Sequence, residues 1–438
     1  MEIERRRLPT GAQDAILHHI VMRDEKIYYG WANLAMAALA MVATLPGRTQ
    51  GLGLITESLI SDLHVDRVTY ATINLWATLI GAAFCLPCGR LLDRYGSRIV
   101  LTLTVLFLGA TVVGMRWMQG IAALSIAITL TRGFGQSALS VVSLALVGKW
   151  FARRLNLAMG VYALLVGIGF IAAFPSVGAA VLKYGWRASW GAVGWVLLLI
   201  VAPVSWAIVR NQPEDRGLEL DGVAEPVEKL TDLTTREALR SPAFWIFALS
   251  SSLFGLVYSG ISLFNESILV ERGFDASVYH KVLVVSTMLG LLANFGGGWL
   301  ATKMPIQKLS GIGMAALAVA LVILPLVKTY THVMIYGAIM GIAGGVVTVV
   351  FFSVWGQVFG REHLGRIQGW AQMMTVFASA VGPLLLAETL RSTGSYNFIF
   401  NFLAVLTVLL GVGAWFVTLP ARQIAHGPDR IFLSTGTA

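Results

Sequence analysis

The stretch Gly89-Arg90-Leu91-Leu92-Asp93-Arg94-Tyr95-Gly96-Ser97-Arg98 joins two apolar segments of the chain, residues 69–92 and 98–118. Four of its ten residues are charged. Glycine at position 89 allows a neighbouring helix to come close, and Gly96 allows the backbone to reverse tightly. Asp93 can pair with an arginine or face a helix N-terminus, where negative charge is favoured. The stretch therefore predicts a short polar loop between two long apolar helices.

The composition around this loop is typical of a protein that crosses a membrane many times. Of 438 residues, 56% are hydrophobic and 13% are charged, whereas an average soluble domain carries about 25% charged residues. A helix needs about 20 mostly apolar residues to cross the hydrocarbon. Twelve segments meet this requirement, near residues 29–53, 69–92, 98–118, 121–147, 156–182, 186–209, 242–268, 277–301, 308–328, 332–358, 366–388 and 396–419. They predict an all-α polytopic membrane protein with twelve transmembrane helices.

The formal net charge of +9 is explained by the distribution of lysine and arginine among the loops. If both termini are cytoplasmic, 22 of the 32 basic residues lie in cytoplasmic segments and 8 in segments on the opposite side. Basic residues concentrate on the cytoplasmic side of membrane proteins, so this topology is the expected one. No basic patch is left over for nucleic acid. The N-terminus lacks the apolar core and cleavage site of a signal peptide, so we expect the first span to be retained.

The chain divides near its midpoint into two related halves. Residues 54–91 and 263–300 align without gaps at an offset of 209, with nine identities in 38 positions, where roughly three are expected by chance, which indicates an internal repeat. In parallel repeats of this kind the substrate site lies near the bilayer midplane, and one half rocks against the other. We expect cytoplasmic segments at 1–28 and 420–438, six-helix bundles at 29–210 and 242–419, and a cytoplasmic linker at 211–241.

The charged loop resembles the signature between helices two and three of the major facilitator superfamily, Gly-x-Leu-x-Asp-Arg-x-Gly-x-Arg, at every fixed position. The resemblance implies two pseudo-symmetric six-helix bundles and a cytoplasmic gate that this carboxylate helps to hold closed. We carry the gating role to Asp93, Arg94 and Arg98, with Gly89 and Gly96 shaping the loop; the alternative is a basic loop with no mechanical role. The second-half counterpart, 298–303, lacks the aspartate, so we expect a latch that is stronger in the first half.

Two arginines lie inside the predicted spans. Arg132, in Thr131-Arg132-Gly133-Phe134-Gly135-Gln136, resembles the mid-helix arginine that the superfamily associates with coupling or binding; the alternative is a packing role. Arg48 follows Leu45-Pro46-Gly47, and this stretch resembles the monocarboxylate and oxalate/formate porters, in which a basic residue follows a proline. A charge within the hydrocarbon is costly unless it faces protein or water, so both arginines should point inward. For Arg48, snorkelling to the outer surface is the alternative.

The chain departs from the porter branch in helix eight, where that branch carries an acidic–basic pair or a basic residue. Gly290 and Asn294 occupy these positions, and no Asp or Glu lies near the predicted midplane. A cavity with two arginines and no acid attracts an anion. We therefore predict a substrate site anchored on Arg48 and lined by Arg132, Tyr258, Asn294, Gln372, Trp76 and Asn74. Glu57 and Glu266, toward the outer ends of helices one and seven, are predicted gating or coupling residues.

These features favour a secondary transporter that moves a small, monocarboxylate-like organic anion across a plasma membrane or bacterial inner membrane. We expect a monomer that works as a proton symporter or as an anion-exchanging antiporter. A multidrug-type exporter and a non-transporting receptor on the same scaffold are alternatives. No nucleotide loop, HExxH or GxSxG motif occurs, and the pair Cys85 and Cys88 offers only two of the four ligands of a structural zinc site. We expect no enzyme activity, no cofactor and no metal.

Overall fold

A computed structural model describes residues 28–220 and 232–420, apart from some side chains within them. Every regular element in this part of the chain is a helix. The predicted cytoplasmic segments 1–28 and 420–438 lie almost entirely outside the described residues. The first-half helices are α2 (Gly30–Val42), η1 (Leu45–Gly47), α3 (Thr49–Gly53), α4 (Thr56–Leu63), α5 (Arg67–Ala82), α6 (Cys85–Gly114), η2 (Met115–Trp117), α7 (Gly120–Thr131), η3 (Arg132–Leu139), α8 (Ser140–Trp150), α9 (Leu155–Tyr184), α10 (Trp186–Val196), η4 (Leu197–Val201) and α11 (Ala202–Ile208).

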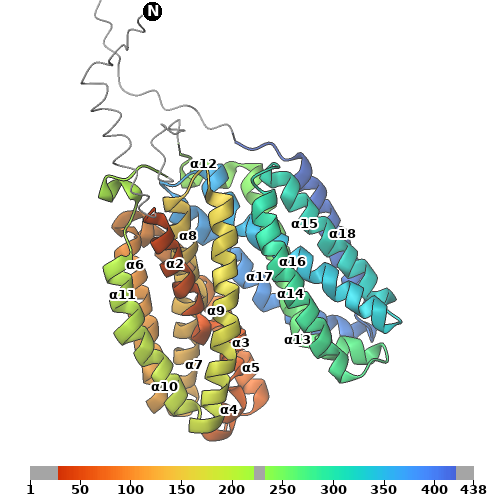
Figure 1. Ribbon diagram of the computed structural model, residues 1–438. Coiled ribbons are helices and arrows are strands. Elements are labelled where there is room, and N and C mark those ends of the chain that lie inside the picture. Colours follow the sequence, from red (N-terminus) through yellow and green to blue (C-terminus); the bar gives the residue numbers. More distant parts are fainter. Residues whose placement is uncertain (1–27, 221–231, 421–438) are drawn as a thin grey trace, which may run out of the picture.

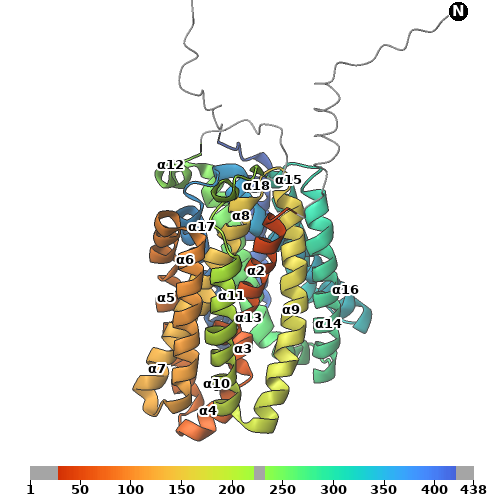
Figure 2. The same cartoon turned by 60° about the vertical axis from the view of Figure 1, so that its left-hand side comes forward.

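A connecting region and the second half follow. The connection contains η5 (Pro213–Arg216) and α12 (Thr235–Arg240), and the second half comprises α13 (Pro242–Glu271), α14 (Ala276–Leu300), α15 (Ile306–Ile323), η7 (Leu324–Leu326), α16 (Tyr330–Phe359), α17 (Leu364–Thr393) and α18 (Asn397–Phe416). Figure 1 shows two bundles of long helices, α2 to α11 in one and α13 to α18 in the other. Figure 2 shows the first bundle from another side, with α9 and α14 side by side.

Eleven helical segments of the described residues are long and apolar enough to cross a membrane. One of them, Thr69–Trp117, has 49 residues and would be about 73 Å long at 1.5 Å per residue, more than twice a hydrocarbon core of about 30 Å. This segment contains the second and third predicted spans, and the backbone reverses inside it at Gly96, whose φ is 82°. The count of twelve crossings therefore stays a prediction.

The first predicted span, 29–53, is not one continuous helix. Its helix ends at Val42, and the chain then passes through the short turn η1 and an extended residue, Arg48, before α3 begins. Pro46 explains the break, because proline lacks the N–H that a helix interior needs. Arg48 therefore does not lie on a straight continuation of the helix that begins the first predicted span.

The two halves share a hydrophobic core only at the end of the molecule that carries Asp93, here called the latch end. One buried cluster runs through the first half and continues into Trp355, Phe359 and Ile367 of the second. A separate cluster, which includes Val257, Tyr336 and other second-half residues, fills the rest of the second bundle. In Figure 1 the ribbons of the two bundles meet at the latch end and diverge toward the opposite end. The structure is therefore closed at the latch end.

Candidate functional site

The break in the first helix is held against an irregular segment of the fourth. The segment η3 is a π-helical stretch between α7 and α8, and such bulges often occur at functional sites. Gly47 lies directly against it: a Cβ at this position would be 2.2 Å from the Thr131 carbonyl oxygen. Proline and glycine together thus interrupt the first helix and let it approach the fourth. The residue that follows them, Arg48, takes an extended conformation with φ −89° and ψ 152°.

The partners of Arg48 among the described residues are neutral groups. Its Nε donates to Thr44 Oγ1 (2.6 Å), one terminal nitrogen donates to Met41 Sδ (2.9 Å), and its guanidinium carbon lies 5.2 Å from the centre of the Phe170 ring. No carboxylate of the described residues forms an ion pair with it. The side chain is partly exposed. Because a guanidinium has five N–H groups, Arg48 keeps donors that an anion could use.

Arg132 has a different environment. It is 3% exposed, and four neutral oxygens surround its terminal nitrogens: the Gly47 carbonyl (3.1 Å), Thr49 Oγ1 (3.0 Å), Gln136 Oε1 (2.9 Å) and Asn74 Oδ1 (3.1 Å). These acceptors belong to the break in the first helix, to η3 and to α5. Arg132 therefore ties three helices together, and among the described residues it too has no carboxylate partner.

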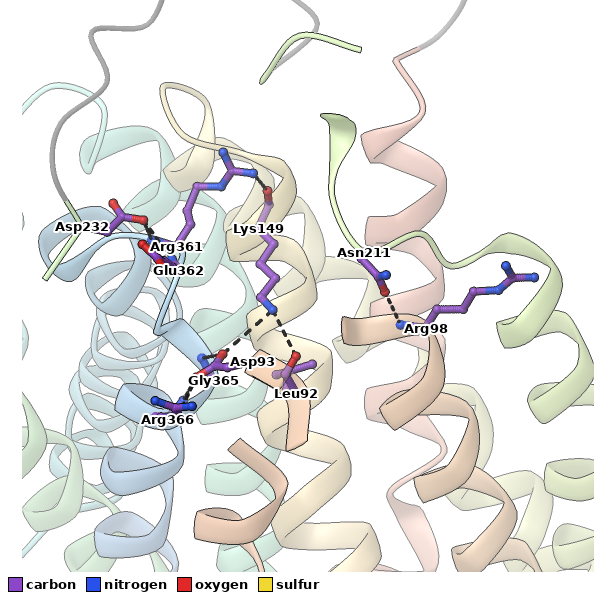
Figure 3. Close-up of polar contacts among 10 residues, drawn as sticks. All are labelled: Leu92, Asp93, Arg98, Lys149, Asn211, Asp232, Arg361, Glu362, Gly365 and Arg366. Atoms are coloured by element: carbon purple, nitrogen blue, oxygen red, sulfur yellow. Dashed lines mark hydrogen bonds and ion pairs between the residues drawn. The ribbon is translucent and has the colours of Figure 1, made fainter. Parts of the chain in front are cut away.

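The predicted latch residue Asp93 lies between the two halves, as Figure 3 shows. Its side chain is 3% exposed, and its two oxygens accept hydrogen bonds from the backbone N–H groups of Gly365 and Arg366, both at 3.0 Å. The Lys149 ammonium and Arg366 Nε lie 4.0 and 3.6 Å from the carboxylate. The carboxylate of the first half therefore sits at the N-terminus of α17 in the second half, where the helix dipole favours negative charge.

Two glycines of the signature loop make this contact possible. A Cβ at Gly89 would lie 2.3 Å from the Gly365 carbonyl oxygen, so only glycine allows α6 to come this close to α17. Gly96 has a positive φ that glycine tolerates. A Cβ there would also be 2.4 Å from Asn211 Oδ1, the atom that accepts the Arg98 N–H at 3.0 Å.

The structure does not bring the two loop arginines to the latch. The Arg98 side chain donates to the Trp206 carbonyl at 2.7 Å and lies over the Trp206 ring, within the first half. Arg94 lies over Tyr95, with its guanidinium carbon 5.3 Å from the ring centre. The cations beside Asp93 are instead Lys149 and Arg366. Lys149 lies near the end of α8 in the first half and Arg366 near the start of α17 in the second. Nothing in either sequence segment alone indicates that both side chains meet the same carboxylate.

The pseudo-symmetric position in the second half carries a neutral contact. Asn156 of α9 donates its side-chain N–H to the Ala301 carbonyl at 2.7 Å. Gly298 packs on Gly160, where a Cβ on Gly298 would be 3.0 Å from the Gly160 Cα. The halves therefore meet at two equivalent places, and only the first one contains an ion pair in the described structure.

The signature loop, its buried carboxylate at α17 and the two-bundle fold agree with a match to a known family. The Major Facilitator Superfamily profile matches residues 34–332 and 261–432, which span both halves. The chain belongs to the Major Facilitator Superfamily.

Individual proteins also resemble this chain in sequence or in fold. The chain is 25% identical over 354 residues to monocarboxylate transporter 13 of Rattus norvegicus, with 79% of each chain covered. It is 24% identical over 413 residues to monocarboxylate transporter 11 of Homo sapiens, covering 91% of this chain and 85% of that one. In fold it resembles the crystal structure of the human organic anion transporter MFSD10 (TETRAN), with a TM-score of 0.64 and 14% identity over 90% of this chain and 100% of that one. This superfamily member is thus a multi-pass membrane transporter and not an enzyme, and the relatives it resembles include monocarboxylate transporters.

The other residues predicted to line the transporter's site are not joined by one polar network in the described structure. Asn74 belongs to the Arg132 network. Tyr258 stacks on Phe254 and borders a small cavity of about 30 Å³ between α13, α14 and α16. In the described residues, no polar contact joins Tyr258, Asn294, Gln372 or Trp76 to Arg48 or Arg132.

The remaining predicted residues are placed as follows. Trp76 is 58% exposed, Gln372 is partly buried, and Asn294 has a buried side-chain oxygen without a hydrogen-bond partner among the described residues. Glu57 lies in α4 and Glu266 in α13, but their side chains fall outside what the structure describes. Their gating or coupling role stays a prediction.

Proposed function

We propose that this transporter moves a small, monocarboxylate-like organic anion across the cell membrane by alternating access. The proposal includes twelve crossings, cytoplasmic termini, a monomer, and bundles 29–210 and 242–419 that rock about the linker 211–241. One observation carries it: Arg48 is a partly exposed cation with unused N–H groups and no carboxylate partner among the described residues. The names of the monocarboxylate and organic anion relatives support the same class of substrate.

The chemistry of Arg48 suits a carboxylate. Guanidinium groups bind carboxylates through two parallel N–H···O bonds, and such charge-assisted bonds are about twice as strong as neutral ones. The hydroxyl and thioether that Arg48 contacts in this structure are neutral acceptors. An incoming carboxylate would therefore replace weak partners with a strong one. A cationic solute would meet two buried or half-buried arginines and be repelled.

In this proposal Arg132 acts from behind the site. Its guanidinium is buried and bonded to four neutral oxygens, two of which belong to the residues directly before and after Arg48. It fixes the break in the first helix and thereby the direction of the Arg48 side chain. Its charge adds to the positive potential without touching the anion.

Coupling remains part of the proposal, as proton symport or as exchange for a second anion. The helix-eight positions that hold charges in the porter branch are Gly290 and Asn294 here. A proton carried with the anion would then travel on Glu57, Glu266 or the substrate's own carboxylate. Uptake that rises with an inward proton gradient would support symport. Uptake that needs an anion on the far side would support exchange.

Uptake by the purified protein in liposomes tests the proposed anchor. Arg48→Gln should abolish uptake of a transported carboxylate, a loss of about 100-fold or more for two charge-assisted hydrogen bonds, while the protein still inserts and folds. Arg116→Gln is the matched control, because that arginine is exposed at the opposite end from the latch and lies over Trp117. Equal uptake by wild type and Arg48→Gln would remove Arg48 from the mechanism, and Arg48-independent efflux of apolar compounds would favour the multidrug-type exporter.

A further inference from the structure

The loop between α16 and α17 joins more parts of the molecule than the signature latch does. In Figure 3 the Asp232 side chain meets the backbone of this loop at Arg361 and Glu362, and the Arg361 side chain points toward Lys149, beside the Asp93 contact. The loop follows Phe359 and includes Gly360, Arg361 and Glu362. It contacts the end of the inter-bundle linker, the beginning of that linker and the first half. None of these contacts belongs to the signature motif.

Asp232, near the end of the linker, fixes the backbone of this loop. Its Oδ2 accepts the N–H groups of Arg361 and Glu362, both at 2.8 Å. The next residue, Leu233, donates its N–H to the Phe359 carbonyl at 3.0 Å. Gly360 has φ 95°, and a Cβ there would lie 2.1 Å from Asp232 Oδ1. The loop therefore has both the backbone shape and the space that the Asp232 carboxylate needs.

The linker is itself held in place immediately after Asp232. Thr234 and Glu237 form a capping box that starts α12: the Thr234 hydroxyl accepts the Glu237 N–H, and the Glu237 carboxylate accepts the Thr234 N–H at 2.8 Å. A capping box satisfies two otherwise unpaired N–H groups at a helix start. Asp232 thus sits on a short, well-bonded segment that leads directly into α13 of the second half.

Arg361 reaches from this fixed loop across to the first half. One terminal nitrogen donates to the Lys149 carbonyl at the end of α8, and the other lies 3.4 Å from Glu214 in η5, where the linker begins. Lys149 in turn lies beside Asp93. Since Lys149 belongs to the first half and Arg361 to the second, the Arg361 contact must break whenever the halves separate at the latch end.

The position equivalent to Arg361 in the first half is not an arginine. The residue 209 positions before Arg361 is Ala152, and the residue 209 positions after Asp93 is Thr302. The second half therefore lacks the carboxylate of the first, and the first lacks the arginine of the second. The contacts of Asp93 and Arg361 therefore lie at the same place, around Lys149, and come from different loops.

We propose that Arg361, positioned by Asp232 of the linker, is a second latch of the transport cycle that acts beside Asp93 at the same end of the molecule. The linker is then part of the gate, because its last described segment sets the direction of the arginine that closes it. This inference rests on the proposed alternating access. Weakening either residue shifts the population toward the state that is open at the latch end.

Distances between labels on the two halves test this proposal. Spin labels on Arg154→Cys and Lys303→Cys, both exposed and in different halves, report opening by pulsed electron resonance, and the native cysteines are buried. Arg361→Ala and Asp232→Ala should each raise the open fraction about tenfold or more, as expected for the loss of at least one charge-assisted hydrogen bond. Asp232→Asn, which keeps an acceptor oxygen, should give a smaller rise.

Glu362→Ala is the matched control. Its side chain is exposed and makes no polar contact within the described residues, although its N–H is bonded to Asp232. The open fraction should stay at the wild-type value. Two distance populations in the wild type that Arg361→Ala and Asp232→Ala leave unchanged would overturn the second latch and leave alternating access intact. A single population in the wild type, with and without a transported carboxylate, would overturn alternating access and the latch with it.

Discussion

The two halves of the transporter meet at two equivalent places, but the side chain and the backbone group that bond there change positions between the two. At the latch end, the first half offers the Asp93 carboxylate to two backbone N–H groups of the second half. At the equivalent place, an Asn156 side chain of the first half donates to the Ala301 backbone carbonyl of the second. A helix leaves N–H groups unpaired at its start and carbonyls unpaired at its end. Asp93 accepts from two such N–H groups, and Asn156 donates to such a carbonyl. The repeat thus preserves where the halves meet and changes how they are bonded.

The opposite end of the molecule follows the same rule. In the first half, Arg187 binds Asp62 at 2.7 Å and the carbonyls of Arg116 and Met118. In the second half, Arg272 donates to the Leu324 carbonyl at 2.9 Å and to Asn397 at 3.0 Å. Each arginine joins the three connections between helices at this end of its own half. Arg187 lies at the start of α10, whereas Arg272 directly follows α13. Among the side chains that the structure describes, only the first-half version includes an ion pair.

The largest effect should come from removing the charged latch. Asp93→Ala leaves two N–H groups at the start of α17 without their acceptor and leaves Lys149 and Arg366 without their anion. We expect uptake into liposomes to fall about 30- to 100-fold, the equivalent of about 2–3 kcal/mol for a hydrogen-bonded buried charge. Thr302→Ala, the same change at the equivalent second-half position, should leave uptake within about twofold, because Thr302 bonds only within its own turn. Equal losses would mean that the halves are not mechanically different.

The next effect concerns the buried arginine that the second half replaces with Gly341. Arg132→Gln should lower the free energy of unfolding by about 2 kcal/mol, because hydrogen bonds from a charged donor to buried acceptors are lost. A fall in Tm of several degrees in detergent would show this. Arg48→Gln should leave Tm unchanged, since its partners are a hydroxyl and a thioether. A stable Arg132→Gln protein with weakened substrate affinity would instead place Arg132 in the binding site.

The fold was largely predictable from the sequence, because hydropathy and repeat length are properties of local segments. Asp93, Gly89 and Gly96 were also found, since the signature loop carries its own geometry. The break at Pro46 and Gly47 was not placed, because its register depends on how Gly47 packs against η3. Arg98 and Arg94 were expected at the latch from the resemblance to the superfamily signature, whereas the Arg98 side chain donates to the Trp206 carbonyl within the first half.

Partners from distant segments were the hardest to anticipate. Arg366 and Lys149 lie 273 and 56 positions from Asp93 in the chain, and only the packing of α6 on α17 and α8 brings them together. Asp232 lies in a polar linker in which any of several acidic residues could have served. Predicting such contacts requires knowing which loops share an end of the molecule and how closely their glycines let them approach.

A smaller effect should follow from removing the neutral contact between Asn156 and Ala301. Asn156→Ala removes one hydrogen bond to the Ala301 carbonyl, which is worth about 1 kcal/mol, or about a fivefold change in the balance between closed and open states. The labelled pair described for Arg361 measures this directly. A shift as large as that of Asp93→Ala would contradict the difference between the halves.

The smallest effect should distinguish the Arg187–Asp62 contact of the first half from the Arg272–Asn397 contact of the second by the pH dependence of stability. Hydrogen bonding from the Arg187 side chain, aided by Trp186 and by the charge of Arg187, holds the pKa of Asp62 below its ordinary value. A carboxyl with a lowered pKa stabilises the fold above its unfolded pKa of about 3.9, and this contribution is lost as pH falls through the lower folded value. Asp62→Asn should therefore cost less than about 1 kcal/mol at pH 7 and nothing in strong acid, because exposed ion pairs contribute little. Asn397→Ala removes an acceptor of Arg272 that does not titrate, so it should lower Tm equally at both pH values. A loss of Tm in Asn397→Ala that changes with acid would contradict this.

The claim on which the transport proposal depends is that Arg48 is an unpaired cation available to an anion. Titration calorimetry of the purified protein with a carboxylate selected by thermal shift measures this without any transport step. We predict that wild type binds the carboxylate and that Arg48→Gln, with an unchanged Tm, binds it about 100-fold more weakly or not at all. Equal affinity of the two proteins for the carboxylate would contradict the account.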